Sequence, residues 1–238
     1  MMITQVQKQE VHDFLHSRKI PVDVLIEMED HFVTQIIDVQ SEKNIGFNEA
    51  FIYVKDLWKD ELKMKYSYWL HLYAPSFLMK IINREFFKTF RKAVAFSVFT
   101  TALTVLFAKT LVKEVFIEAF FGINFIVLGI PLLVLIFFLL KDYKYFDTKK
   151  QSLQYSVYQR NSIAIFLGFI FQIKNIMDPE EQASNFLAYF SGEKTAVNFY
   201  IMILAGTILT AYSIFGFLNL LQHQKIVSKL KNQLKKAN

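Results

Sequence analysis

Residues Val115–Leu140 form a nearly continuous apolar run in which Glu118 is the one charged residue. A helix of about 20 mostly apolar residues is long enough to cross the hydrocarbon core of a bilayer. The segment VLGIPLLVLIFFLL within this run lacks the polar face that a surface helix of a soluble protein needs. The run therefore predicts a transmembrane helix. Pro131 predicts a kink, which neighbouring helices can accommodate by bonding to the freed carbonyl.

Three further segments extend the membrane region. Ala93–Leu111 and Val197–Leu221 are long enough to span. The segment 162–177 is weaker, because Gln172 and Lys174 interrupt its apolar character. It fits either a full span or a re-entrant or interfacial segment, and we favour the span because the flanking loops require it. The predicted fold class is all-α: a polytopic membrane protein with about four transmembrane helices.

Charge in the loops predicts the orientation of these helices. Segments 78–92, 141–161 and 222–238 are rich in Lys and Arg, whereas 174–195 is acidic. Basic loops stay in the cytoplasm, so four spans place both termini on the cytoplasmic side of a bacterial inner membrane. The net charge of +6 comes from residues that flank apolar runs. We therefore expect contact with an anionic inner leaflet and no binding of nucleic acid.

The first seventy residues have the composition of a soluble helical domain. Periodicity predicts helices from Thr4 to Arg18, from Pro21 to a turn at 44–46, and from near Phe47 onward. The middle helix has an apolar stripe made of Leu25, Met28, Phe32, Ile36 and Val39. Its opposite face is polar and carries Glu27, His31, Thr34 and Asp38. The predicted parts of the chain are a cytoplasmic three-helix domain, an amphipathic helix, a transmembrane domain and a basic cytoplasmic tail, at 1–75, 76–92, 93–221 and 222–238.

A family resemblance covers residues 10–60. The helix with an E-L-x-x-H-type patch, the Gly-containing turn and the following s-x-x-E-A helix start have counterparts here in Glu27, Asp30, His31, Gly46, Glu49 and Ala50. In these features the segment resembles the prefix domains of some bacterial permeases and the HAAS domain of membrane proteins linked to PadR-type transcription regulators. The resemblance implies a helical domain that binds a cytoplasmic protein partner, such as a PadR-type regulator.

These features favour a non-catalytic membrane sensor or adaptor. The expected partner-binding surface is the polar face of the second helix with its neighbours, namely Glu27, Asp30, His31, Thr34, Asp38 and Glu49. No phosphate-binding Gly-rich loop, H-E-x-x-H or G-x-S-x-G motif is present. We therefore expect no enzyme activity and no cofactor. A homo-oligomer is left open, as is a role as a component of a larger membrane complex.

The alternative function is a small transporter, or an accessory subunit of one. Glu118, Asn124 and Gln172 are polar residues within the apolar segments, and such residues mark functional sites or interhelical hydrogen bonds. A transporter would have polar side chains converging on a water-filled cavity, whereas an adaptor would have a closed bundle.

The segment 76–92 is amphipathic. Its apolar residues recur every fourth position, at Leu78, Ile82, Phe86 and Phe90. Its basic residues are Lys80, Arg84, Lys88, Arg91 and Lys92. This pattern predicts a helix lying on the membrane surface. The alternative is that the helix packs on the soluble domain.

Histidines in the N-terminal domain give a weak metal hypothesis. His12 and His16 are one helical turn apart, and Glu27, Asp30 and His31 cluster on the next helix. Such a set could form a mixed His and carboxylate site. The simpler interpretation is a solvated polar face, and we predict no metal.

Overall fold

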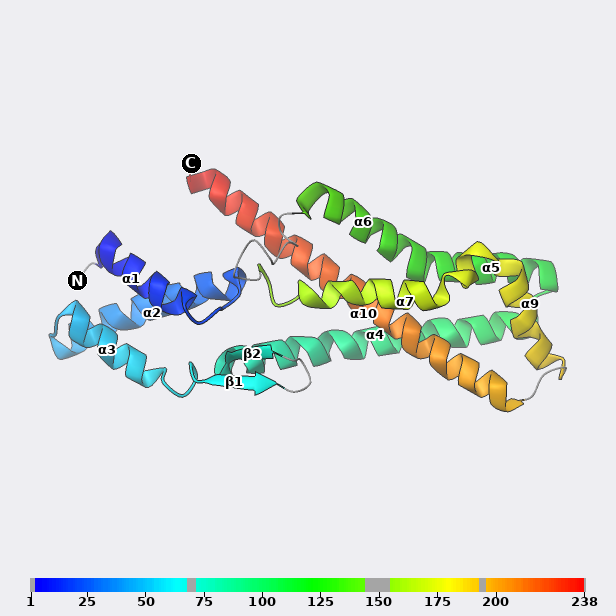
Figure 1. The fold of residues 1–238 in the computed structure, drawn as a ribbon, viewed down its shortest axis with the longest axis horizontal. Coiled ribbons are helices and arrows are strands. Elements are labelled where there is room, and N and C mark those ends of the chain that lie inside the picture. Colours follow the sequence, from blue (N-terminus) through cyan, green and yellow to red (C-terminus); the bar gives the residue numbers. More distant parts are fainter. Residues whose placement is uncertain (1–2, 68–71, 144–154, 193–195, 238) are drawn as a thin grey trace. The chain divides into compact units, whose positions relative to one another are not determined.

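The computed structural model describes residues 3–67, 72–143, 155–192 and 196–237 and is mostly helical (Figure 1). The N-terminal elements are α1 (Gln5–His16), α2 (Val22–Lys43), α3 (Phe47–Leu57), β1 (Met64–Ser67) and β2 (Leu72–Pro75). The later elements are α4 (Ser76–Thr110), α5 (Lys113–Asn124), the π-helix η1 (Phe125–Gly129), α6 (Ile130–Asp142), the 3₁₀ helix η3 (Arg160–Ile163), α7 (Ala164–Gln172), α8 (Lys174–Met177), α9 (Pro179–Phe190) and α10 (Ala196–Ala237).

The chain forms two compact units. The first takes its described residues from Met1–Glu85, Asp147–Val157 and Ile226–Asn238, and the second from Phe86–Phe146 and Tyr158–Lys225. Among the described residues, three helices are long and apolar enough to cross a membrane, at Ser76–Thr110, Lys113–Asp142 and Val197–Asn232. Length and hydropathy therefore support a membrane protein.

The core of the first unit is formed by α1, α2 and α3. Thr4 and Gln7 form a capping box at the start of α1. The left-handed backbone of Asn44 ends α2. All five residues of the predicted α2 stripe are buried, and Phe32 packs against Phe14 and Trp58. The 3.6-residue periodicity therefore identified the buried face of α2 correctly.

A β-hairpin follows α3, and the all-α prediction omitted it. β1 and β2 pair antiparallel, with Met64 opposite Pro75 and Ser67 opposite Leu72. Leu62 and Ala74 at the base of the hairpin are buried in the same core. The predicted third helix accordingly stops at Leu57, and Leu62 enters the core from a turn rather than from a helix.

The predicted amphipathic helix is not a separate element, because α4 runs unbroken from Ser76 to Thr110. Leu78 is buried in the core of the first unit, and Ile82 packs against that core. In the second unit, Phe86 and Phe90 contact Phe215 with ring centroids 5.1 and 6.1 Å apart. Among the apolar residues of the predicted pattern, only Leu78 and Ile82 thus pack on the N-terminal domain, as the alternative interpretation has it, and the membrane-surface role of the basic residues stays a prediction.

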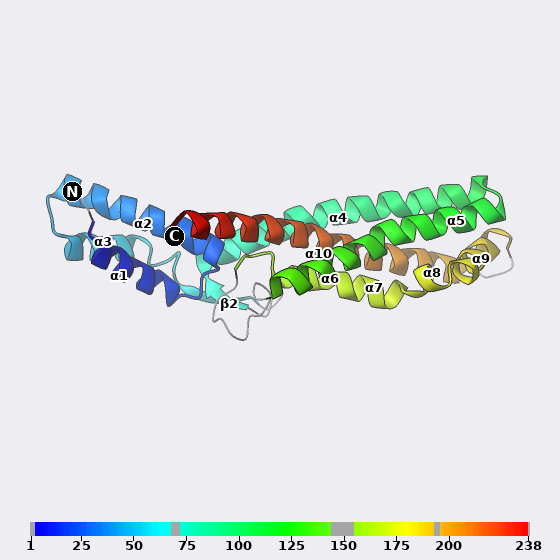
Figure 2. The same cartoon turned by 90° about the horizontal axis from the view of Figure 1, so that it is seen from above.

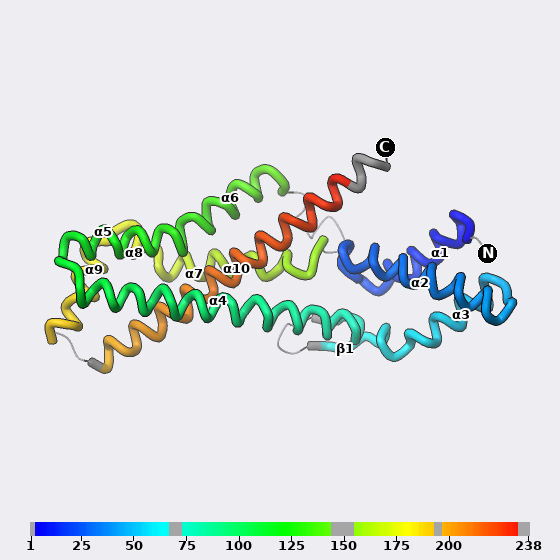
Figure 3. The backbone as a smooth tube through the Cα atoms, turned by 180° about the vertical axis from the view of Figure 1, so that it is seen from behind, coloured from blue at the N-terminus to red at the C-terminus, as the bar shows by residue number. Residues whose placement is uncertain are grey.

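In the second unit, the chain reverses direction after α4 and continues as one long helical segment made of α5, η1 and α6 (Figure 3). Proline lacks an N–H and clashes with the carbonyl four residues earlier, which for Pro131 is that of Val127. The residues Phe125–Gly129, which come just ahead of Ile130 and Pro131, form a π-helix, and the Ile130 N–H bonds to the Phe125 carbonyl. The freed Val127 carbonyl accepts a hydrogen bond from Ser213 Oγ at 3.1 Å. The predicted compensation by a neighbouring helix is therefore present.

The segment 162–177 is not the continuous helix that a simple span would form. It starts in η3 and continues through the nine-residue α7 and the four-residue α8, with Ile173 between them. Asp178 then leaves the helical conformation, and Pro179 opens α9. These short helices run alongside α6, η1 and α5 (Figure 2). The apolar segment is interrupted where Gln172 and Lys174 interrupt its sequence.

Two glycines allow α7 and α10 to approach closely. A Cβ atom at Gly216 would lie 2.5 Å from the backbone nitrogen of Ile165. A Cβ atom at Gly168 would lie 2.7 Å from Ser213 Cβ and 2.9 Å from the Leu209 carbonyl. Small residues at such contacts are the usual way in which membrane helices approach each other. The crossing holds α7 against the middle of α10.

Candidate functional site

The second unit contains a cavity of about 160 Å³ that is lined by both polar and apolar side chains. Its described polar lining comes from α4, α5, α7, α8, α9 and α10 and comprises Thr100, Thr101, Thr104, Asn124, Gln172, Asn175, Gln182, Thr207 and Thr210. Thr101, Val127 and Thr210 each lie near the middle of a predicted apolar run. None of the described residues that line the cavity carries a charge. The site is thus uncharged, has a polar part within a partly apolar lining, and lies midway along the apolar helices.

Two irregular stretches of helix border this cavity. Asn124 precedes the π-helix and Val127 lies within it. Gln172 and Asn175 stand on either side of the junction between α7 and α8. Within a membrane, irregular backbone is tolerated where it is buried in protein or lines a cavity, and π-helical turns often occur at functional sites. Both irregularities therefore point to this cavity as the functional region.

Three side-chain amides connect the walls of the cavity. Asn175 Nδ2 donates to Asn124 Oδ1 at 3.1 Å and to Gln172 Oε1 at 3.4 Å. Gln172 Nε2 in turn donates to Thr210 Oγ1 at 3.4 Å. Asn124 Nδ2 donates to the Phe120 carbonyl of its own helix. This network joins α5, α8, α7 and α10 around the cavity.

The threonines line the side formed by α4 and α10. The hydroxyls of Thr100, Thr104 and Thr207 donate to the carbonyls of Ser97, Thr100 and Ile203, respectively, each on its own helix. Between the helices, Thr101 Oγ1 lies 2.9 Å from Thr207 Oγ1, and Ser97 Oγ donates to the Thr207 carbonyl. Hydrogen bonds between hydroxyls and backbone therefore join α4 to α10 beside the cavity.

Two of the three predicted transport residues belong to this site. Asn124 and Gln172 line the cavity, as the transporter alternative requires. Glu118 is exposed and is not among the described lining residues, so its place on the same path stays a prediction. It lies on α5 one to two turns before Asn124, on a different face of the helix.

The sequence interpretation missed the threonines and Asn175. Thr100, Thr101 and Thr104 are hydroxyl residues within an otherwise apolar run, and their spacing places Thr100 and Thr104 on one face of a helix. That spacing was an available signal. It was weak because a hydroxyl in a membrane helix can bond to its own backbone without any ligand.

The predicted partner-binding residues of the first unit all lie at the surface. The side chains exposed there are those of Glu27, Asp30, His31, Thr34, Asp38 and Glu49. The predicted basic residues of α4 are also exposed, namely Lys80, Arg84, Lys88, Arg91 and Lys92. Acids of the protein lie beside some of them: Lys80 is 2.7 Å from Glu61, and Arg84 is 3.4 Å from Glu85.

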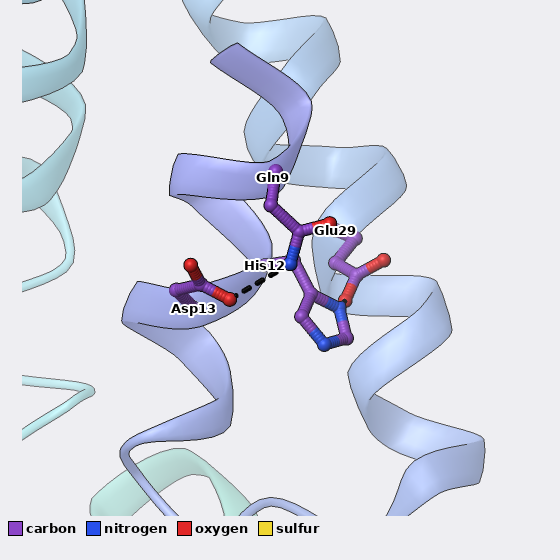
Figure 4. A network of polar contacts seen from close by, with 4 residues as sticks. All are labelled: Gln9, His12, Asp13 and Glu29. Atoms are coloured by element: carbon purple, nitrogen blue, oxygen red, sulfur yellow. Dashed lines mark hydrogen bonds and ion pairs between the residues drawn. The ribbon is translucent and has the colours of Figure 1, made fainter. Parts of the chain in front are cut away.

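The histidines of the first unit make contacts other than metal ligation. His12 Nδ1 bonds to Glu29 Oε1 of α2 (Figure 4). The His12 ring stacks on that of His16, with ring centroids 5.6 Å apart. Gln9 Nε2 donates to Asp13 Oδ1 at 2.8 Å beside this pair (Figure 4). Within the described ranges, no three His or acidic residues come together to hold a metal ion. His31 therefore does not complete a site with His12 and His16.

Comparison of the chain with protein-family models, with curated proteins and with solved structures gave no match.

Proposed function

We propose that this chain is a small membrane transporter, or a transporter subunit, that binds a small polar solute in the cavity between its apolar helices. The observation that carries the proposal is the convergence of uncharged polar side chains from α4, α5, α7, α8, α9 and α10 on one cavity. Polar groups are costly in the interior of a membrane, and they are kept there where they serve a pathway or satisfy one another. The proposed function is non-catalytic.

The form of the segment 160–190 supports the same proposal. Transporters commonly place their substrate site near the middle of the membrane, where helices are discontinuous. Here the junction of α7 and α8 and the π-helix both adjoin the cavity. A purely anchoring bundle would have no need for two interruptions facing the same polar space.

Thiol labelling tests whether the cavity is open to water. The natural chain has no Cys, so Thr104→Cys introduces a single thiol on the cavity wall. The thiolate is the reactive form, and it forms in water rather than in hydrocarbon. In proteoliposomes we expect a small membrane-impermeant thiosulfonate reagent to label this variant at least about tenfold faster than a lipid-facing position.

Leu106→Cys is the matched control, because Leu106 lies on the same helix and is an apolar residue that is 53% exposed. Equal inertness of the two variants would mean that the cavity is closed to water, and the transporter proposal would then fail.

We also propose the four-span topology. In this arrangement η3, α7 and α8 together form a discontinuous third span, and both termini lie in the cytoplasm of a bacterial cell. The charges support this orientation, because the N-terminal part of α4 and the segment after α6 are basic and the segment around α9 is acidic. An odd number of spans would place one basic terminal segment outside.

Reporter fusions measure this topology directly. A fusion after Lys150 and one after Asn238 should both give a cytoplasmic signal, and one after Gly192, beyond α9, should give an external signal. The Asn238 fusion is the control for expression. A cytoplasmic signal at Gly192 would show that the segment 160–190 is re-entrant or interfacial.

A second candidate function is that of an adaptor or sensor whose N-terminal domain binds a cytoplasmic protein. The observation in its favour is the surface formed by Glu27, Asp30, His31, Thr34, Asp38 and Glu49, which the packing of the apolar stripe leaves exposed. Four of these six residues are acidic, so the surface suits a basic partner, as charge complementarity governs association rate and specificity. The resemblance to HAAS and permease-prefix domains suggests a PadR-type regulator as that partner.

Charge reversal tests the adaptor surface. The double variant Glu27→Lys and Asp38→Lys should keep its helix content, because exposed charges contribute little to stability. It should weaken association with a PadR-type regulator supplied in purified form, with the largest loss at low salt. Reversal of Glu10 and Asp60 makes the same change in net charge outside this surface, and equal loss in both variants would exclude a specific site.

A further inference from the structure

The hydroxyl hydrogens of four threonines around the cavity are already used within the protein. A threonine hydroxyl has one hydrogen to donate and two lone pairs that accept. Thr100, Thr104 and Thr207 donate theirs to backbone carbonyls at 2.9, 2.9 and 2.7 Å. Because the Thr207 hydrogen points at the Ile203 carbonyl, the bond between Thr101 and Thr207 must be donated by Thr101. These four oxygens can therefore offer only lone pairs to a ligand.

The side-chain amide network also leaves an acceptor, rather than a donor, at Asn175. Asn175 Nδ2 makes two hydrogen bonds, to Asn124 and to Gln172, which use both of its hydrogens. Asn175 can therefore offer a ligand only its carbonyl oxygen. Gln182 and Thr210 also line the cavity and carry hydrogens of their own, so the acceptor character belongs to the four threonines and Asn175, whose oxygens are neutral.

This wall excludes two of the common classes of charged solute. An anion is held most strongly by positively charged donors, and the described lining contains no Lys, Arg or His. A divalent cation is normally bound by carboxylates, and the described lining contains no Asp or Glu. Neutral oxygen atoms are the groups that replace the hydration shell of a monovalent cation in membrane proteins.

We propose that the solute bound in this cavity is a small monovalent cation of the ammonium or alkali-metal class, held by the oxygens of Thr100, Thr101, Thr104 and Thr207. This inference rests on the proposed transporter function and specifies its substrate. A cavity of about 160 Å³ has room for several water molecules. A partly hydrated potassium or ammonium ion therefore fits, while a large organic cation does not.

Binding to the purified full-length protein tests this inference. Isothermal titration would compare chlorides of potassium, sodium, ammonium and methylammonium with N-methylglucamine chloride at constant ionic strength. We expect at least one of the small cations to bind and N-methylglucamine not to bind. In the double variant Thr100→Val and Thr104→Val, which keeps side-chain volume but removes two oxygens, the affinity should fall about tenfold or more, since a hydrogen bond to a charged group contributes strongly.

Thr110→Val is the matched control. Thr110 lies on the same helix and donates to the Leu106 carbonyl at 2.9 Å, but it is exposed and is not among the described lining residues. The Thr110→Val variant should bind the cation as tightly as the natural chain does. Thr104→Ser, which restores one oxygen, should recover part of the affinity lost by Thr104→Val alone.

The outcomes separate this inference from the proposed function. If Thr104→Cys is labelled by the aqueous reagent but no small cation binds better than N-methylglucamine, the cavity still serves transport and the cation assignment is wrong. The assignment is also wrong if urea or acetamide binds in a threonine-dependent manner while the cations do not. If Thr104→Cys is inert to the reagent, both proposals fail together.

Discussion

We expect Gly216→Ala to lower the free energy of unfolding of the second unit by about 1–3 kcal/mol, the usual cost of overpacking a tight contact. A Cβ atom at this position would lie 2.5 Å from the Ile165 backbone nitrogen and 2.8 Å from its Cγ1. The close neighbour is backbone, which cannot rotate away as a flexible side chain can. α7 and α10 must therefore separate. Thermal unfolding in detergent should show a midpoint lower by roughly 2–12 °C.

Gly122→Ala provides the control for this prediction. A Cβ atom at Gly122 would meet nothing within 4 Å, and alanine is the better helix former by about 1 kcal/mol. The control should therefore leave the midpoint unchanged or raise it. Equal behaviour of the two variants would contradict a close crossing of α7 and α10.

The second large effect concerns pH and the first unit. Burial raises the pKa of Asp23 from its ordinary value of 3.8 to about 6, outweighing hydrogen bonds from the backbone N–H groups of Val24 and Val157 that lower it. The folded chain therefore holds this proton more tightly than the unfolded chain does. Stability from this group is complete below pH 4 and is lost as pH rises to about 6. Two pKa units correspond to about 3 kcal/mol.

Asp23→Asn should remove this loss, because an amide has no charge to bury and can still accept a hydrogen bond. At pH 7.5 we expect the variant to be more stable than the natural chain by about 1–3 kcal/mol. At pH 4 the two should be similar. Amide hydrogen exchange in α2 of the full-length protein measures both values.

Asp30→Asn is the matched control, because Asp30 lies on the same helix and is exposed. Its substitution should change stability little at either pH. If Asp23→Asn and Asp30→Asn show the same pH dependence, the buried carboxyl of Asp23 is not the group that destabilises the folded unit.

Much of the helical architecture follows from local sequence. The stretch 127–140 has no polar face and can be only a buried or membrane helix, and the structure has a long helical segment, Lys113–Asp142, at this place. The apolar spacing of Leu25, Phe32 and Ile36 specified the buried face of α2. Both signals are periodic or extended, so each depends on residues that are neighbours along one helix.

Other features depend on contacts that local sequence does not contain. The amphipathic pattern of the segment 76–92 suits a membrane surface and a protein surface equally well, and only the structure shows that Leu78 packs in the core of the first unit and that Phe86 contacts Phe215 in the second. The hairpin of β1 and β2 is short, and four-residue strands carry too little alternation to be distinguished from a loop.

The candidate site shows the same division most clearly. The sequence by itself determined that Asn124 and Gln172 are polar residues in apolar segments, and that Thr100 and Thr104 share one face of α4. Only the tertiary structure decided that these side chains surround one cavity and that Glu118 stays outside it. The reason is physical: the hydrogen bond from Ser97 to Thr207 joins residues 110 positions apart, and a cavity forms where such distant helices pack together, which no local pattern encodes.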